Sequence, residues 1–320
     1  MQLLSVALNQ APGHILRHNI FGADGRRLLP KGRRLTEKDI HLLEEIGHVS
    51  VSVAVLEAGD VHEDLAARRL AELVVGSGLR QTKPVHSRVN VLAELDGIVR
   101  VNVEALQSIN AIEGLTIATL HNTQLVRAKK RVATIKIIPF AVPEQAMIRA
   151  EKIAHTAGSL IRVDPLRPQT VGVILVGSAP RLEEMLLPAI SARVSALGSH
   201  VTIAQRVDAN EQQISHAIDT YAMTGVGLII IAGETSIMDR DDVTPRAIRL
   251  AGGQIEHYGA PVEPGNLLLM AYLRDIPILG APGCVRSSAP NVVDLLLPRL
   301  LAGERLGAQD IIALGHGGLL

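Results

Sequence analysis

The chain has 320 residues, of which 32 are basic and 32 acidic; 2% are aromatic and none is tryptophan. This length suffices for two domains with hydrophobic cores. The balanced charge provides no global attraction to nucleic acid or to an anionic membrane, and the few aromatic side chains argue against a base-stacking platform. The single cysteine, Cys284, excludes an internal disulfide, and no apolar run is long enough to cross a membrane. A cytoplasmic protein is expected.

The first half of the chain contains both strand and helix patterns, but they do not alternate regularly as in a parallel sheet. Apolar runs between polar turns predict strands at residues 49–56, 98–103 and 132–140. Thr36 and Asp39 predict a helix start, because a hydroxyl and a carboxylate three residues apart can each bond the other's backbone amide. A second helix is predicted at residues 63–75, with these side chains buried: Leu65, Leu70, Leu73 and Val74. Residues 1–168 are therefore expected to form a mixed α+β domain of unknown role.

A boundary is predicted after a helix at residues 144–157, where Pro165 and Pro168 interrupt regular structure. Beyond it, apolar strands and helices alternate. The strands are predicted at residues 170–176, 200–204 and 227–232, and the helices at residues 181–197, 211–223 and 244–251. Connections of this length between buried strands predict a mainly parallel sheet with helices on both faces. Residues 169–320 are therefore expected to form a three-layer α/β/α domain.

The end of the chain continues this pattern less regularly. Two short strands are predicted at residues 267–273 and 276–280, followed by a loop and a final helix that reaches Leu301. The glycine-rich tail from Gly307 is expected either to fray or to dock, on its own domain or on a second copy.

Three loops follow the predicted strands, at residues 177–180, 233–242 and 280–288, where parallel sheets collect their ligands. Small residues let backbone amides approach a phosphate, and Arg286 adds a positive charge. Hydroxyl donors come from Thr235, Ser236, Ser287 and Ser288. Each loop alone could equally be a solvated turn. Their joint placement favours an anion site.

Carboxylates gather in the second of these loops. Asp239, Asp241 and Asp242 directly precede a predicted helix, so one of the last two would cap it. Three carboxylates beside a phosphate loop would also hold Mg²⁺. Spacing alone slightly favours capping. Asp208 lies in a further polar loop, where Asn210 is an equally good cap and leaves Asp208 open to another role.

Other polar positions favour structural interpretations. Cys284 has no histidine near it in sequence, so a packed side chain is favoured over a nucleophile. In the first half, Ser87, Asn90 and Asn110 lie among apolar residues. Structural hydrogen bonding is favoured for them over ligand binding.

Four segments of the second half form a pattern of short motifs. The run from Ala232 to Ser236 is similar to a glycine loop, Ser/Thr-Gly-Gly-Thr followed by a small residue, and Asp242, Val243, Thr244 and Pro245 match an Asp-Val-Thr-Pro signature. Pro264, Gly265 and Asn266 resemble a Pro-Gly-Lys element, and residues 280–287 resemble a Gly-Leu-Pro-Gly-Asn-Pro-Val-Ser loop. In these motifs the second half of the chain resembles the molybdenum cofactor biosynthesis domain shared by molybdopterin adenylyltransferases, whose branch has the Asp-Val-Thr-Pro signature, and molybdopterin molybdenumtransferases.

The resemblance implies roles for particular residues. Asp242 and Asp208 would be catalytic, with molybdopterin or molybdate as the ligand. From the carboxylate cluster, Asp241 and Asp242 would hold Mg²⁺. The resemblance and the composition of the loops together give these expected contacts to the pterin and its phosphate: Gly177, Ser178, Gly233, Glu234, Thr235, Ser236, Gly265, Asn266, Pro282, Gly283, Cys284, Arg286, Ser287 and Ser288.

Two loops depart from the family pattern. Glu234 stands where the family has its second loop glycine, and the first loop reads Val176, Gly177, Ser178 and Ala179 where Thr-Gly-Asp-Glu is usual. A carboxylate is thus lost from one loop and gained in another, where it would weaken anion binding unless a cation intervenes.

Three functions are consistent with these residues. The first is a molybdenumtransferase-like enzyme acting on adenylylated molybdopterin. The second is a non-catalytic carrier or chaperone that serves a nucleotidyltransferase or a molybdoenzyme. The third is a pyridine-nucleotide enzyme that acts on a pyrophosphate. A homo-oligomer is expected in each case, without nucleic-acid or membrane partners.

Overall fold

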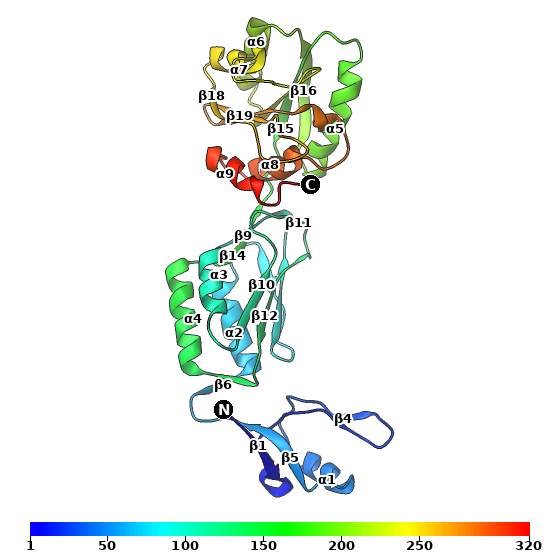
Figure 1. Ribbon diagram of the computed structural model, residues 1–320, viewed down its shortest axis with the longest axis vertical. Helices are drawn as coiled ribbons and strands as arrows, with labels where there is room; N and C mark the ends of the chain where they lie inside the picture. Colours follow the sequence, from blue (N-terminus) through cyan, green and yellow to red (C-terminus); the bar gives the residue numbers. More distant parts are fainter. The chain divides into compact units, whose positions relative to one another are not determined.

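The computed structural model describes residues 1–320 as two compact units, Met1–Asp164 and Pro165–Leu320 (Figure 1). Their boundary falls in the proline-interrupted stretch singled out above. None of the helices has the length and apolar character needed to cross a lipid bilayer.

The first unit begins with a small antiparallel sheet in the order β1-β5-β2, with bounds Gln2–Ala7, Ser50–Val55 and Ile15–Leu16. A hairpin of β3 (Ile20–Phe21) and β4 (Arg27–Leu29) follows β2. Helix α1 (Glu37–Glu45) begins after Thr36, whose backbone N–H and hydroxyl both donate to Asp39 Oδ2, at 3.0 and 2.8 Å. The predicted helix start is therefore confirmed.

The rest of this unit is built on a four-stranded antiparallel sheet in the order β10-β12-β8-β7. Its strands span Leu115–Thr119, Arg131–Ile137, Arg88–Ala93 and Leu79–Gln81. The helices are α2 (Glu63–Val74), α3 (Val103–Asn110) and α4 (Glu144–Ala157). Smaller sheets pair β11 (Leu125–Val126), β9 (Gly97–Val101) and β14 (Ile161–Pro165), and β13 (Ala141–Pro143) with β6 (Asp60–His62).

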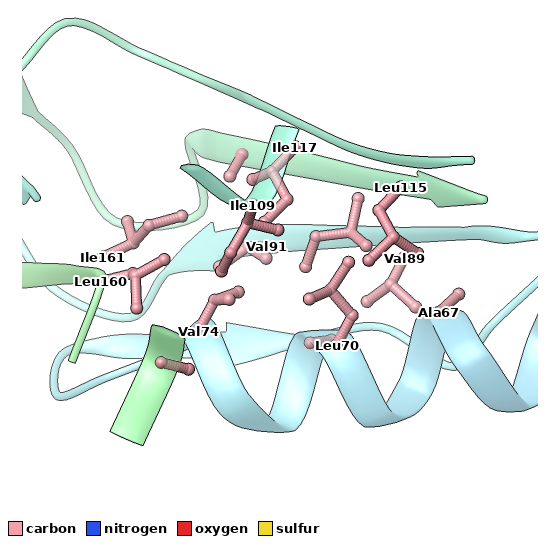
Figure 2. Close-up of a cluster of buried hydrophobic side chains, with 14 of the residues drawn as sticks. Ala67, Leu70, Val74, Val89, Val91, Ile109, Leu115, Ile117, Leu160 and Ile161 are labelled. Atoms are coloured by element: carbon pink, nitrogen blue, oxygen red, sulfur yellow. The ribbon is translucent and has the colours of Figure 1, made fainter. Parts of the chain in front are cut away.

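Helix α2 packs its apolar face onto this sheet. Figure 2 shows Ala67, Leu70 and Val74 of α2 pointing toward Val89 and Val91 of β8. The prediction that Leu65 is buried was wrong, since 48% of Leu65 is exposed, and Leu73 is only partly buried. The buried face consists of Ala66, Ala67, Leu70, Ala71 and Val74. Three small alanines on this face let the helix lie close to the sheet, and this phase turns Leu65 outward.

The second unit is centred on a six-stranded sheet in the order β16-β15-β17-β20-β19-β18. The strands span His200–Val207, Thr170–Val176, Leu228–Gly233, Ile276–Gly280, Leu269–Leu273 and Gln254–Tyr258. The first four run parallel, whereas β19 is antiparallel to both of its neighbours. The prediction of a mainly parallel sheet is confirmed. The helices are α5 (Leu182–Ala196), α6 (Glu211–Met223), α7 (Val243–Leu250), α8 (Val292–Leu301) and α9 (Ala308–Ile312).

Close packing of α6 on β15 explains one glycine of the central strand. The fully buried Tyr221 donates its hydroxyl to the carbonyl of Val173 at 3.1 Å. A Cβ atom at Gly172 would lie 2.4 Å from the Tyr221 ring, so only glycine fits beneath it. Burial raises the pKa of Tyr221 to about 12, and the phenol therefore acts as a neutral donor.

The carboxyl-terminal tail docks on its own unit. The backbone N–H of Glu263 donates to Gly318 at 2.7 Å, and that of Leu320 donates to Glu263 at 2.9 Å. Of the two expectations for the tail, fraying and docking, the structure therefore shows docking, through backbone hydrogen bonds.

Candidate functional site

The four parallel strands of the second unit end at one edge of the sheet. Val176 at the end of β15 is paired with Val207 of β16 on one side and with Gly233 of β17 on the other. Ile231 of β17 is opposite Gly280, the last residue of β20. Because the strands are parallel and in this register, the loops that follow them meet at the same edge. The polar loops predicted from the sequence are therefore brought together here.

A small cavity of about 50 Å³ lies at this edge, between the loop after β17 and the start of α7. Ala209 and Ala281, from the loops after β16 and β20, complete it. Its polar lining comes from Glu234, Thr235, Ser236, Asp242 and Thr244. The cavity has room for a group the size of a phosphate rather than for a ring system. Four of the predicted site residues with polar side chains thus face one space.

Glu234 reaches from the second loop across to the first. Its Oε2 accepts a hydrogen bond from the backbone N–H of Ala179 at 2.8 Å. Gly177, with φ of 144°, lies directly beneath this carboxylate, because a Cβ atom there would be 2.6 Å from the Glu234 Cδ. Glycine is therefore required at position 177 for the carboxylate to pass. The amide of the first loop is already bound by an anionic group of the protein itself, and Ser178 is exposed beside it.

Asp242 caps helix α7. Its Oδ1 accepts from the N–H of Val243 at 3.2 Å and its Oδ2 from the N–H of Met238 at 2.9 Å. Asp242 is therefore the residue that caps this helix, one of the two that the sequence offered. Each oxygen accepts only one of these bonds and keeps a lone pair that can accept another. Asp242 can therefore cap the helix and still contact a cation.

Arginines of α7 hold Asp241 of this loop. Arg249 forms an ion pair with Asp241 at 2.8 Å, and Arg246 donates to the Asp241 carbonyl at 2.8 Å. Asp239 accepts from the N–H of Asp241 at 2.6 Å. No group of three or more His, Cys, Asp or Glu side chains is arranged to hold a metal ion. For Asp241 to bind Mg²⁺, as the sequence predicts, the ion would have to displace Arg249.

Asp208 follows β16 and is held by the helix after it. Its N–H donates to Gln213 Oε1 at 3.1 Å, and its Oδ2 accepts from Gln213 Nε2 at 3.3 Å. Asn210 caps α6 by accepting from the N–H groups of Gln212 and Gln213. The cap expected at Asn210 is therefore present, and Asp208 does not contribute to it.

The third loop is joined to the second by one hydrogen bond. The N–H of Gly283 donates to Ser236 Oγ at 3.3 Å. Cys284 is half-buried, and burial raises the pKa of its thiol, which disfavours the thiolate. Arg286 and the following Ser287 and Ser288 are exposed.

Arg193 on α5 organises this loop and was missed at the sequence level. Its guanidinium donates to the carbonyls of Val285, Ser287 and Ala289 at 2.8–3.0 Å and forms an ion pair with Asp294 at 3.0 Å. Its side chain is 9% exposed. The sequence did contain a signal that Arg193 is buried. Arg193 lies three residues after the buried Ile190, and therefore on the same face of a largely apolar helix.

Gly265 and Asn266 lie beside the start of α8 and do not line the cavity. A Cβ atom at Gly265 would be 2.5 Å from Val292 Cγ1, so this glycine permits close packing against the helix. Asn266 Nδ2 donates to Glu263 at 2.9 Å.

The fold is an α/β domain whose polar loops gather at the carboxyl ends of its parallel strands. Residues 173–302 match the family model described as "Probable molybdopterin binding domain". The second unit thus carries a divergent domain of this molybdenum cofactor biosynthesis family. A second model, for a domain of unknown function (DUF8806), matches residues 5–55. No curated protein matches the chain.

Several solved structures are similar to parts of the chain. The molybdopterin biosynthesis enzyme MoaB of Thermus thermophilus is 19% identical with a TM-score of 0.32, and the match covers 42% of this chain and 98% of MoaB. The molybdopterin biosynthesis moeA protein of Pyrococcus horikoshii is 13% identical with a TM-score of 0.34, and the match covers 94% of this chain and 75% of that one. A molybdopterin biosynthesis protein of Mycobacterium abscessus is 14% identical with a TM-score of 0.30, covering 42% and 92%. Because these scores are low, the domain assignment rests on the family model.

Proposed function

We propose that the second unit binds molybdopterin at the edge formed by the loops after its parallel strands, and that the protein is a molybdenumtransferase-like enzyme acting on adenylylated molybdopterin. The observation that carries this proposal is the convergence of Thr235, Ser236 and Asp242 on one cavity within the segment that matches the molybdopterin-binding family. The cavity would receive a phosphate group of this ligand, and the pterin would lie along the exposed loops outside it.

The hydroxyls of the second loop suit a phosphate. Ser236 Oγ accepts from Gly283, which leaves its own hydrogen available to a ligand. Thr235 is exposed beside it. Hydrogen bonds between hydroxyl donors and an ionised phosphate are among the stronger polar contacts in proteins. Ser236 would therefore couple phosphate binding to the position of the third loop.

Asp242 fits the role of a Mg²⁺ ligand better than Asp241. Each Asp242 oxygen accepts a single backbone hydrogen bond and can accept another, whereas Asp241 is paired with Arg249. Mg²⁺ in proteins is commonly held by one or two carboxylates together with substrate phosphates, and it neutralises charge between them. Asp242 would place its carboxylate toward the phosphate in the cavity, and Asp208 would act from the neighbouring loop.

Calorimetric titration of the full chain with molybdopterin, with and without Mg²⁺, tests this proposal. Ser236→Ala and Gly283→Trp should both weaken binding, and Asp242→Asn should remove the dependence on Mg²⁺. Asp219→Asn, on the exposed face of α6, is the matched control for loss of a carboxylate. A folded protein that binds no molybdopterin, or variants that bind like the wild type, would overturn the proposal.

A carrier is the second candidate function, and one set of contacts favours it. Asp208 is bonded to Gln213, Asp242 caps α7, and Glu234 occupies the amide of Ala179, so each of these carboxylates already has a structural partner. Incubation with molybdate and adenylylated molybdopterin distinguishes the two candidates. Repeated turnover would exclude the carrier, whereas one equivalent of tightly bound cofactor without product would support it.

A further inference from the structure

The first unit contains a polar cavity that is separate from the proposed molybdopterin site. No residue that was given a role in that site lines it. We call it the Lys136 cavity. It has a volume of about 270 Å³ and lies where residues near the β3–β4 hairpin meet the start of α2 and the end of β12. Its polar side chains are Asn19, Arg27, Lys31, Glu63, Ser87 and Lys136, and His86 lies at its wall. Pro30, Ile138 and Phe140 provide apolar lining.

One wall of the cavity is a tight turn with unusual backbone conformation. His86 and Ser87 have φ values of 49° and 63°, and they are flanked by reciprocal backbone hydrogen bonds between Val85 and Arg88 at 3.0 and 3.2 Å. Two-residue turns with positive φ at both positions favour Asn-Gly, because larger side chains are strained there. Strained backbone of this kind persists only where its surroundings hold it in place.

Contacts from two other elements hold this turn. The N–H of Ser87 donates to Asp64 Oδ1 at 2.8 Å, and the carbonyl of Ser87 accepts from the N–H of Ile137 at 3.0 Å. Lys136 Nζ donates to Ser87 Oγ at 2.7 Å. Ser87 itself is 1% exposed, so its hydroxyl is a fixed partner for the ammonium group. The turn therefore pins the charge of Lys136 at the wall of the cavity.

Positive charge predominates around this space. Arg27, Lys31 and Lys136 line it, and Glu63 is the only carboxylate among the lining residues. Glu63 is buried, and desolvation together with the nearby Asp64 raises the pKa of its carboxyl, while Lys136, the Ser87 hydroxyl and Lys31 oppose this rise. Even when Asp64 beside the turn is counted, two carboxylates face three cations, which leaves a net attraction for a negative ligand.

We propose that the Lys136 cavity binds a small organic oxyanion, a carboxylate or a phosphate monoester with an apolar body. Lys136 and Lys31 hold the oxyanion, with Arg27 at the rim, and Ile138 and Phe140 contact the apolar body. The volume exceeds what an inorganic oxyanion fills, and apolar and polar groups both line the space. This site would be independent of molybdopterin binding in the second unit.

Titration of the full chain with phenyl phosphate, benzoate and inorganic phosphate, followed by NMR, tests this inference. Phenyl phosphate or benzoate should bind saturably and more tightly than inorganic phosphate, and the preferred one of the two identifies the oxyanion. Lys136→Met and Lys31→Ala should each weaken binding about tenfold, because each removes a charge-assisted contact. Lys152→Ala, on the exposed face of α4, removes one lysine elsewhere in the same unit and should change nothing.

Lys31 is exposed, so its variant should keep the wild-type melting temperature even if loss of Lys136 disturbs the turn. Each of three results would overturn the inference. The first is that neither organic anion binds saturably. The second is that Lys31→Ala and Lys152→Ala change the affinity for these anions equally, and the third is that inorganic phosphate binds as tightly as phenyl phosphate.

Discussion

Replacing Glu234 by glutamine should tighten molybdopterin binding when Mg²⁺ is absent. In the structure the Glu234 carboxylate accepts from the N–H of Ala179 at 2.8 Å and lies at the edge of the cavity expected to receive a phosphate. Glu234 is exposed, so its repulsion of a ligand acts through water-like surroundings. Two unit charges about 4 Å apart then interact by about 1 kcal/mol. A phosphate carries between one and two charges, so the repulsion amounts to about 1–2 kcal/mol.

Glu234→Gln should therefore lower the dissociation constant about 5- to 30-fold, as the same free energies imply. Glutamine keeps an oxygen for the Ala179 amide, so the loop should be unchanged. With Mg²⁺ present the gain should shrink, because the cation offsets the carboxylate. Glu183→Gln, on the exposed start of α5, controls for the loss of one negative charge in the same unit. Calorimetry that shows weaker binding by Glu234→Gln without Mg²⁺ would refute this reasoning and make Glu234 a ligand-binding group.

Three further predictions concern stability and follow from particular contacts. Arg193→Met should destabilise the second unit by about 2–3 kcal/mol in chemical denaturation, because it leaves three carbonyls and a carboxylate without their donor; an unchanged midpoint would contradict this. Gly172→Ala should cost about 1–3 kcal/mol by forcing the Tyr221 ring away from β15, with a lower melting temperature as the measure. Burial raises the pKa of Asp39, but hydrogen bonds from Arg33 and Thr36 outweigh it and lower the folded-state pKa below the unfolded value. Asp39 therefore stabilises the fold above the unfolded pKa of about 3.9, and this contribution is lost as pH falls through the folded pKa. Asp39→Asn should flatten the acid limb of the unfolding curve, and an identical acid limb would count against the assignment.

The alternation of strands and helices in the second unit could be predicted because it depends on local sequence patterns. Strands such as β15 and β17 are buried on both faces, so they appear in the sequence as continuous apolar runs. The capping bonds of Asn210 and Asp242 go to amides one to three residues further along the chain, and a short motif is enough to reveal them. The predicted strand ends then placed the polar loops at one edge, since parallel strands allow no other arrangement.

The remaining features depend on partners that are distant in sequence. β19 runs antiparallel between β20 and β18, and nothing in its own five buried residues distinguishes that direction from the parallel one. Arg193 finds its carbonyl partners more than 90 residues away, and Glu234 bonds an amide 55 residues before it. Such contacts are chosen by the assembled fold, so a motif can indicate that a polar side chain is unusual without indicating what it binds.

Ser87 shows how this difference affects the interpretation of function. A polar residue among apolar neighbours is most simply a structural hydrogen-bonder, and Ser87 does bond Asp64 and Lys136. Those same bonds fix a lysine at the wall of a cavity lined by two further cations. A structural role and a role in placing a binding group are therefore compatible in one side chain. The difference lies in whether Lys136 faces packed side chains or open space, and the cavity shows that it faces open space.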